Sequence, residues 1–309
     1  MKLVVTGGAG FIGAHLVNRL LAAGHDVVAL DNFVRPSPLA RQLSSAGAHV
    51  IEGDVRDIHT VRMAMQGARR VYHLAAQSNV MDAEAERAYT MTTNVIGTRN
   101  VLQAAREVAI ERVVFTSSRE IYGEAQALPV AEETSGAPKN IYGKSKAEGE
   151  RLCRHFSRRY GLDVSVVRLA NVYGPGDTGR VIPLWIDRVA HDLELILFGG
   201  EQLIDFIAVD CVTQALWAAG DRALHGQPVN IGSGVGSSLH DLARRIQSLS
   251  ERRVNLRILP ARSAEVARFV AEVTRMRTLL GVEPPADPLE ALGALVNSAT
   301  PVAQSPRRL

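Results

Sequence analysis

Short apolar runs alternate with amphipathic segments along the first half of the chain. The apolar runs lie near residues 2–6, 26–31, 48–52, 70–74, 111–116 and 163–169. Runs of this length that are rich in Val and Ile are typical of buried strands, and the stretches between them have the apolar spacing of helices. The alternation predicts an α/β fold with a doubly wound parallel sheet of the Rossmann type, covered by helices on both faces.

The pattern loosens after Asn171, and Gly174-Pro175-Gly176 interrupts the chain before Val181. We therefore predict a nucleotide-binding domain at residues 1–170 and a smaller α+β substrate-binding region at 171–300. Part of that second region is expected to pack back on the first domain. Residues 301–309 have the composition of a flexible basic tail.

The composition argues against several classes of function. The chain has 309 residues, 46% of them hydrophobic, and a formal net charge of +3. Its arginines are scattered and do not alternate with aromatic residues, so no nucleic acid partner is expected. No stretch has the length of a membrane span or the pattern of a signal peptide, which favours a cytoplasmic protein away from the membrane. Neither the histidines nor the two cysteines, Cys153 and Cys211, have metal-ligand spacing, so we expect no metal and reduced thiols.

The first predicted strand runs directly into a glycine-rich turn that opens a helix. Glycines at 7, 10 and 13 permit a tight turn and a close approach of the backbone to a pyrophosphate at the helix N-terminus, beside Phe11 and Ile12. Asp31 ends the second predicted strand, where a carboxylate accepts ribose hydroxyls and repels a 2′-phosphate. This favours NAD over NADP, although the nearby Arg35 would favour NADP. A purely structural glycine turn is the alternative.

Tyr142 and Lys146 are four residues apart on a predicted helix, so both side chains lie on one face. An ammonium beside a phenol favours the phenolate, which predicts a lowered Tyr142 pKa and a general base near working pH. A chance Tyr-x-x-x-Lys on an ordinary amphipathic helix is the alternative.

The glycine spacing together with Tyr142 and Lys146 resembles the short-chain dehydrogenase/reductase family. Longer motifs resemble its extended branch, the nucleotide-sugar epimerases and dehydratases. These motifs are Asp54-Val55, His73-Leu-Ala-Ala-Gln77, Thr116-Ser-Ser-Arg-Glu-Ile-Tyr-Gly123 and Arg168-Leu-Ala-Asn-Val-Tyr-Gly-Pro175. The resemblance extends over about residues 1–285.

The resemblance implies a role for each matching position. Tyr142 would act as the base, Lys146 would hold it and the nicotinamide ribose, and Ser118 would bond the substrate oxygen. The implied cofactor-binding residues are Gly7, Gly10, Phe11, Ile12, Gly13, Asp31, Asn32, Asp54, Val55, Leu74, Ala75, Ala76, Thr116, Tyr142 and Lys146. The implied substrate-binding residues are Gln77, Ser117, Ser118, Arg119, Tyr142, Asn171, Arg180, Val181, Arg262 and Glu265.

Two positions depart from the patterns of the relatives. Arg119 stands where dehydratases have an Asp that serves as an acid, which counts against dehydration, whereas Glu120 matches an acidic residue of dehydratases and decarboxylases and is a candidate catalytic residue. Glu120 could instead be paired with Arg119 or face solvent. Ile204 stands where the family that the chain resembles has an arginine that clamps the substrate diphosphate, so this clamp is either absent or supplied from elsewhere, with Arg180 and Arg262 as the candidates.

We therefore predict an NAD-dependent nucleotide-sugar 4-epimerase that acts through a transient 4-keto sugar. A UDP-sugar is the expected substrate, with interconversion of UDP-glucuronate and UDP-galacturonate favoured because the Arg180 fork matches a carboxylate. The alternatives are a UDP-glucuronate decarboxylase, a 4,6-dehydratase and a non-catalytic NAD-binding regulator. A homodimer through the helices near 85–107 and 142–160 is what the family suggests.

Overall fold

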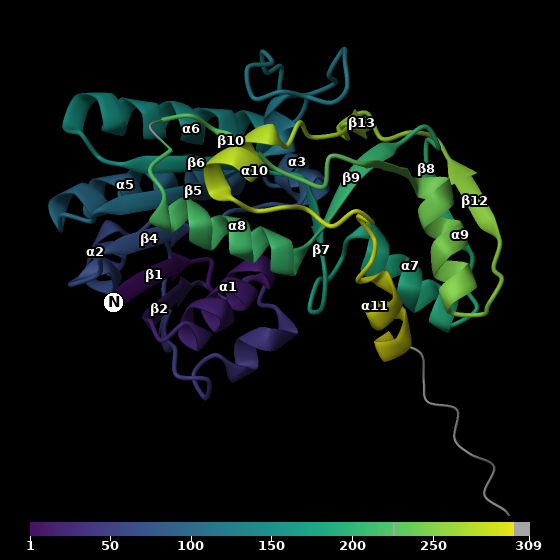
Figure 1. The fold of residues 1–309 in the computed structure, drawn as a ribbon, viewed down its shortest axis with the longest axis horizontal. Coiled ribbons are helices and arrows are strands. Elements are labelled where there is room, and N and C mark those ends of the chain that lie inside the picture. The colour runs from purple at the N-terminus through teal and green to yellow at the C-terminus, as the bar shows by residue number, and fades with distance from the viewer. Residues whose placement is uncertain (225, 300–309) are drawn as a thin grey trace, which may run out of the picture.

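The computed structural model describes residues 1–224 and 226–299, so the predicted tail at 301–309 lies outside the described residues. A large layered part holds the N-terminal half, and a smaller lobe lies beside it (Figure 1). The strands of the large part are β1 (Lys2–Thr6), β2 (Asp26–Asp31), β3 (His49–Glu52), β4 (Arg70–His73), β5 (Arg112–Ser118), β6 (Val164–Leu169) and β10 (Val229–Ile231).

These strands form one parallel sheet in the order β10-β6-β5-β4-β1-β2-β3. All six residues of β6 are buried, as expected of a strand covered on both faces. The predicted doubly wound sheet is confirmed. Its direction of winding reverses between β1 and β4, and open α/β sheets bind ligands beyond the strand ends at such a point.

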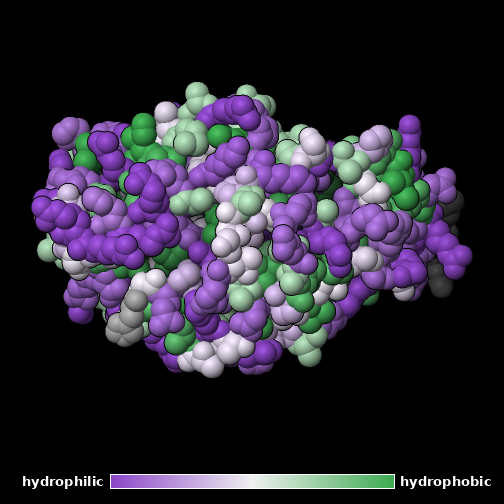
Figure 2. Space-filling view, turned by 90° about the horizontal axis from the view of Figure 1, so that it is seen from above, coloured by the Kyte–Doolittle hydropathy of each residue, from purple (hydrophilic) through white to green (hydrophobic). Residues whose placement is uncertain are grey.

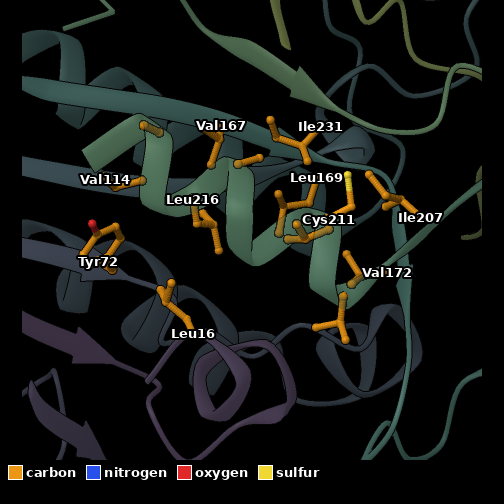
Figure 3. Packing of buried hydrophobic residues seen from close by; sticks show 14 of the residues in the cluster. Leu16, Tyr72, Val114, Val167, Leu169, Val172, Ile207, Cys211, Leu216 and Ile231 are labelled. Carbon is orange, nitrogen blue, oxygen red and sulfur yellow. The ribbon is translucent and has the colours of Figure 1, made fainter. Parts of the chain in front are cut away.

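Helices cover both faces of the sheet (Figure 1). Leu16 and Leu20 of α1 (Phe11–Ala22) pack with Leu216 of α8 (Val209–Asp221) on one face (Figure 3). The other face is covered by α2 (Ile58–Met65), α5 (Gly97–Glu107) and α6 (Ile141–Tyr160), which bury Val101 and Phe156 against Phe115. The 3₁₀ turns are η1 (Pro38–Gln42) and η3 (Arg119–Ile121), and α3 (Val80–Ala85), α4 (Arg87–Met91) and the π-helical turn η2 (Thr92–Ile96) precede α5.

The smaller lobe has its own core, around Trp185, Phe206 and Leu242. Strand β9 (Leu203–Ala208) pairs in parallel with β7 (Asn171–Tyr173) and β13 (Arg268–Phe269) and antiparallel with β11 (Gly236–Ser238). A separate parallel pair joins β8 (Leu195–Phe198) to β12 (Leu256–Leu259). The helices are α7 (Val181–Ala190), α9 (Leu239–Leu249) and α11 (Leu292–Ala299).

The chain passes between the two parts several times. After β9 it returns to the large sheet as α8 and β10, and after β13 it returns again as α10 (Thr274–Leu280), which contacts both of them. The division at residue 170 stays a prediction. These three elements of 171–300 lie in or against the first sheet.

A buried ion pair anchors α6 to the sheet. Nε and Nη2 of Arg168 on β6 donate to the two carboxylate oxygens of Glu150 on α6, at 2.9 and 2.8 Å. The Arg168 Nη1 donates to the Tyr122 hydroxyl at 2.8 Å. A bidentate arginine–carboxylate pair fixes orientation as well as distance, so the rotation of α6 about its axis is set by β6.

The face seen in Figure 2 is largely hydrophilic, with apolar residues in small groups. In the described part of the chain no helix is long and apolar enough to cross a membrane.

Candidate active site

A cavity of ≈ 550 Å³ lies beyond the carboxyl ends of the strands, between the large sheet and the smaller lobe. Of the residues predicted to bind cofactor or substrate, all but Asp54 line it, and Gly53 and Val55 on either side of Asp54 do so as well. The lining predicted residues are Gly7, Gly10, Phe11, Ile12, Gly13, Asp31, Asn32, Val55, Leu74, Ala75, Ala76, Gln77, Thr116, Ser117, Ser118, Arg119, Glu120, Tyr142, Lys146, Asn171, Arg180, Val181, Arg262 and Glu265.

The glycine turn follows β1 and ends where α1 begins at Phe11. Gly7 has φ 71°, and its N–H donates to the Leu30 carbonyl at 2.8 Å. A Cβ on Gly13 would lie 1.9 Å from the Gly7 carbonyl oxygen, which leaves no room for any side chain. The free N–H groups at the start of α1 therefore face the cavity at close range, the arrangement that binds phosphate.

Asp31 at the end of β2 is held by backbone donors. Its carboxylate accepts from the N–H of Ala9 at 3.0 Å and of Phe33 at 2.8 Å. Burial raises the pKa of Asp31, while these N–H groups lower it. Arg35, which could have favoured a 2′-phosphate, is paired with Asp82. The carboxylate is thus placed to accept ribose hydroxyls, with the competing cation already engaged.

A polar cluster surrounds Asp54 at the same end of the cavity. Asn32 donates to Asp54 at 3.1 Å and to the Tyr89 hydroxyl at 3.3 Å. Arg56 pairs with Asp54 at 2.7 Å and lies over the Tyr89 ring at 4.9 Å. The Asp54 side chain is therefore engaged by protein donors, and Tyr89 from α4 contributes to the cavity wall.

Tyr142 and Lys146 lie on one face of α6, as predicted, but the predicted direction of the Tyr142 pKa is wrong. Burial raises the pKa of Tyr142 to about 12. Lys146 Nζ donates to the Thr116 carbonyl at 2.8 Å and lies 5.9 Å from the centre of the Tyr142 ring. The loss of phenolate hydration outweighs nearby positive charge.

Three groups oppose the effect of burial on Tyr142. The hydrogen bond with Ser118 lowers the pKa of Tyr142, and so do the charges of Arg180 and Arg119, whereas Glu120 raises it. Burial also lowers the pKa of Lys146 to about 8. Ser118, Arg180 and Arg119 therefore favour the ionised form of the Tyr142 phenol and partly offset the effect of burial.

Asn94, which the sequence analysis did not identify, joins three parts of this wall. Its amide nitrogen donates to Ser145 Oγ at 2.8 Å and to the Gln77 carbonyl at 3.0 Å, and its oxygen accepts from the Gln77 N–H at 2.8 Å. It lies in η2, and π-helical turns inside helices occur frequently at functional sites. Asn94 thereby fixes Gln77 against the helix that carries Tyr142.

Glu120 is buried and has two partners. Arg119 pairs with one carboxylate oxygen at 2.9 Å, and the Asn140 amide donates to the other at 2.7 Å. The side chains of Arg119 and Glu120 are 12% and 5% exposed. The alternative in which Glu120 is paired with Arg119 is thus the arrangement found, and both oxygens of this carboxylate are engaged.

The smaller lobe contributes two arginines, each with an acidic partner. Arg262 pairs with Glu265 at 3.0 Å and stacks on Phe198 at 3.6 Å. Arg180 donates to Asp177 at 2.9 Å and lies 5.5 Å from the centre of the Phe11 ring. Ile204 also lines the cavity.

Polar atoms without protein partners concentrate in this cavity. Among the described residues, six buried side-chain oxygens have no hydrogen-bond partner, and all but the Tyr72 hydroxyl belong to residues of the cavity wall. They are Gln77 Oε1, Thr93 Oγ1, Ser117 Oγ, Asn171 Oδ1 and Asp177 Oδ2. Such atoms are rare in folded proteins, so their grouping indicates a site built for polar ligands.

Sequence reasoning missed Tyr89, Asn94, Asn140 and Asp177. Asp177 lies three residues before Arg180, and this spacing was the only available signal. Within the described ranges no group of three or more His, Cys, Asp or Glu could hold a metal ion, and both Cys153 and Cys211 are free and buried.

Comparison with known proteins decides the family. Residues 3–232 match the model of the NAD dependent epimerase/dehydratase family. The chain belongs to this family. It is 34% identical over 294 residues to a UDP-glucose 4-epimerase of Mycolicibacterium smegmatis, with 92% of this chain and 94% of that protein covered. A UDP-glucuronic acid decarboxylase of Arabidopsis thaliana is also similar, at 29% identity over 92% of this chain and 65% of that protein.

Solved structures of the family have the same fold. The UDP-glucose 4-epimerase of Thermotoga maritima with UDP-glucose superposes with a TM-score of 0.91 at 29% identity, covering 96% of this chain and 98% of that one. The UDP-glucuronic acid 4-epimerase of Bacillus cereus, in complex with UDP-glucuronic acid and NAD, gives 0.90 at 26% identity, covering 97% and 99%.

This enzyme uses NAD, and its own residues fit that cofactor. The turn at Gly7 and Gly13 excludes side chains from the path of a pyrophosphate, and Asp31 is placed for the ribose. Phe11 and Ile12 would hold the phosphates through their N–H groups, and Lys146 would hold the nicotinamide ribose.

Removal of the Asp31 carboxylate should change the choice of cofactor. We expect Asp31→Ala to weaken NAD binding by about 1.5–3 kcal/mol, the usual contribution of a hydrogen bond to a charged group. NADP binding should improve because the repulsion of its 2′-phosphate is lost. Calorimetric Kd values for both cofactors would measure this, with the exposed Asp26→Ala on the same strand as the matched control. If the unmodified enzyme already prefers NADP, Asp31 does not set the choice.

Proposed function

We propose that this enzyme is an NAD-dependent 4-epimerase of a UDP-sugar. The observation that carries the proposal is the set of Ser118, Tyr142 and Lys146 on one wall of the cavity, with the neighbouring acid Glu120 paired to Arg119. Inversion at C4 requires one group that takes a proton from the 4-hydroxyl and later returns it. Expulsion of water would also require an acid directed at the leaving hydroxyl.

In this mechanism Tyr142 takes the proton of the 4-hydroxyl, and Ser118 shares the hydrogen bond to the sugar oxygen. Ser118, Arg119 and Arg180 favour the phenolate against the effect of burial, so they assist the proton transfer. Lys146 is fixed by the Thr116 carbonyl and keeps its ammonium beside the phenol. NAD supplies the hydride acceptor and donor when bound. After the transfer the keto sugar turns over in the site, and Tyr142 returns the proton.

The alternative reactions differ in whether they use Glu120 as a catalytic group. A decarboxylase or a 4,6-dehydratase would use this carboxylate as a catalytic acid or base, whereas here both oxygens are engaged by Arg119 and Asn140. A non-catalytic NAD-binding regulator would have no need of Ser118, Tyr142 and Lys146 together. The pairing of Glu120 supports epimerisation, and Glu120 would serve to position Arg119 near the phenol.

Product analysis distinguishes these reactions. The NAD-loaded enzyme is incubated with a panel of UDP- and dTDP-sugars, and the products are analysed by mass spectrometry and NMR. Unchanged mass with inverted C4 supports epimerisation. Loss of water would replace it with dehydration, and loss of carbon dioxide with decarboxylation.

The finer proposal concerns the sugar, and a UDP-hexuronate is favoured: UDP-glucuronate interconverting with UDP-galacturonate. Ile204 lacks the positive charge of the relatives, while Arg180 lines the cavity and its charge acts on Tyr142, where the sugar reacts. A guanidinium fork suits a carboxylate at C6. The UDP-glucuronic acid 4-epimerase among the similar structures supports this proposal, and the UDP-glucose 4-epimerases support a neutral hexose.

Arg180→Ala separates these two substrates. If Arg180 bonds a C6 carboxylate, kcat/KM for UDP-glucuronate should fall by about 1.5–3 kcal/mol more than kcat/KM for UDP-glucose. Equal losses on the two substrates would return Arg180 to the diphosphate that both share. Arg188→Ala, later on the same helix, is the matched control because Arg188 does not line the cavity.

Two further proposals concern the state of the protein. We propose a homodimer through the helices near 85–107 and 142–160, and a cytoplasmic location supported by two buried free thiols. The outer side of α6 carries Arg151, Arg154, Arg158 and Arg159 around a shallow depression. Like charges repel, so self-association through this face should strengthen with salt, which light scattering at low and high ionic strength would test.

A further inference from the structure

Asp177 and Arg180 form an ion pair of unequal exposure in the cavity wall. Both belong to the segment between β7 and α7, and the Asp177 side chain is 2% exposed whereas that of Arg180 is 39% exposed. Arg180 Nη1 donates to Asp177 Oδ1 at 2.9 Å. Asp177 is therefore shielded by Arg180, and Arg180 is the member of the pair that a ligand in the cavity can contact.

The second carboxylate oxygen of Asp177, Oδ2, is buried and has no hydrogen-bond donor among the described residues. Burial raises the pKa of Asp177 to about 6, against the opposing effect of Arg180. Arg180 is the main group that stabilises the charge of this carboxylate, and the backbone N–H of Thr178 makes a smaller contribution.

The segment that carries the pair is fixed against the dinucleotide turn. Ser37 Oγ donates to the Gly176 carbonyl at 3.2 Å, and a ring nitrogen of His15 on α1 lies 2.8 Å from the Pro175 carbonyl oxygen. A Cβ on Gly176, which has φ 79°, would lie 2.7 Å from Ser37 Oγ. These contacts hold the residues just before Asp177 against the dinucleotide turn.

We propose that Asp177 sets the charge preference of the sugar site, acting as the buried counter-ion that limits the positive charge Arg180 offers to a ligand. This inference rests on the proposed function, because it assigns Arg180 to the sugar. Asp177 touches no reacting atom and acts through Arg180, so it is a positioning and specificity-determining residue. Its ionised form moderates the attraction of the site for a C6 carboxylate relative to a C6 hydroxymethyl group.

Asp177→Asn keeps the shape of the side chain and removes its charge. Calorimetry on the NAD-loaded enzyme gives the Kd of UDP-glucuronate and of UDP-glucose. We expect the ratio of the two Kd values to move toward UDP-glucuronate by about tenfold, equivalent to 1.4 kcal/mol. The matched control is Asp187→Asn on α7, whose side chain is 69% exposed, and its ratio should stay that of the unmodified enzyme.

The effect must also depend on Arg180. In an Arg180→Ala background, Asp177→Asn should leave the ratio unchanged, because the two substitutions remove the same interaction. An unchanged ratio in Asp177→Asn alone, or the same shift in both backgrounds, would overturn the proposal. Product analysis of the unmodified enzyme tests the proposed function separately, since the Kd ratio can be measured whether or not either sugar is turned over.

The pH dependence of the Kd ratio in the unmodified enzyme gives a second test. Arg180 is the charged group acting on Asp177, with Tyr142 on α6 near Arg180 and His15 on α1 at the Pro175 carbonyl. As the pH falls through about 6, Asp177 takes up a proton and Arg180 loses its counter-ion. The Kd ratio should move toward UDP-glucuronate, whose carboxyl stays ionised, and the ratio in Asp177→Asn should not show this step. A ratio that is constant between pH 7.5 and 5.5 would contradict the proposal.

Discussion

Tyr142→Phe should lower turnover by about 10²–10⁴-fold, the usual contribution of a positioned acid–base group. The substitution removes one hydroxyl and leaves the ring buried in α6, so the fold and NAD binding should persist. Turnover of the preferred UDP-sugar and the amount of NAD that remains bound after gel filtration would be measured together. Retained NAD with lost turnover assigns the defect to proton transfer.

The control for this substitution is Tyr160→Phe, the same change at an exposed position on the same helix. The unmodified enzyme adds a second check through its pH profile. Because burial raises the pKa of Tyr142 to about 12, the phenolate becomes more populated as pH increases, so kcat/KM should rise with pH until Lys146, with a pKa of about 8, loses its charge. An undiminished rate in Tyr142→Phe would exclude Tyr142 as the base.

Gly13→Ala should abolish NAD binding. The added Cβ would lie 1.9 Å from the Gly7 carbonyl oxygen, and the Gly7 backbone is held by hydrogen bonds with Leu30 and Gly10. The turn must widen, which moves the N–H groups of α1 away from the pyrophosphate. Overpacking of this kind costs about 1–3 kcal/mol, so thermal unfolding should also occur at a lower temperature.

Gly10→Ala provides the comparison for stability. Gly10 has φ −70°, and its Cβ would lie 3.2 Å from the same oxygen. The thermal shift of this variant should be clearly smaller than that of Gly13→Ala. Wild-type NAD affinity in Gly13→Ala would show that the turn adapts and that the close approach is not required.

The sequence predicted those features that depend on local pattern. The centre of a strand such as β2, Val27-Val28-Ala29-Leu30, is apolar and buried because both faces of the sheet are covered, so its burial is visible in composition alone. The glycine turn and the Tyr142–Lys146 face follow from spacing along one strand–turn–helix unit and one helix. The sequence led us to expect that part of residues 171–300 packs back on the first domain, but not that α8 and β10 are the elements that do so, because β10 has three residues, too few for a periodic signal.

Electrostatic properties of the site could not be predicted in the same way. The direction of the Tyr142 pKa depends on burial by segments distant in sequence, and the predicted effect of Lys146 ignored that burial. Asp177 three residues before Arg180 resembles an ordinary surface pair in sequence. In the structure the Asp177 side chain is buried, and its loop is held against Ser37 and His15, both distant in sequence.

The repeated passage of the chain between the two parts limits how the enzyme can be divided. A fragment ending at residue 170 would lack α8 and β10, and Val114, Val167 and Leu216 lie together in one core (Figure 3). Such a fragment would expose to water the part of its sheet that α8 covers. Chimeras that exchange substrate specificity between relatives would therefore need splice points at each passage, because one junction after β6 cannot transfer the smaller lobe alone.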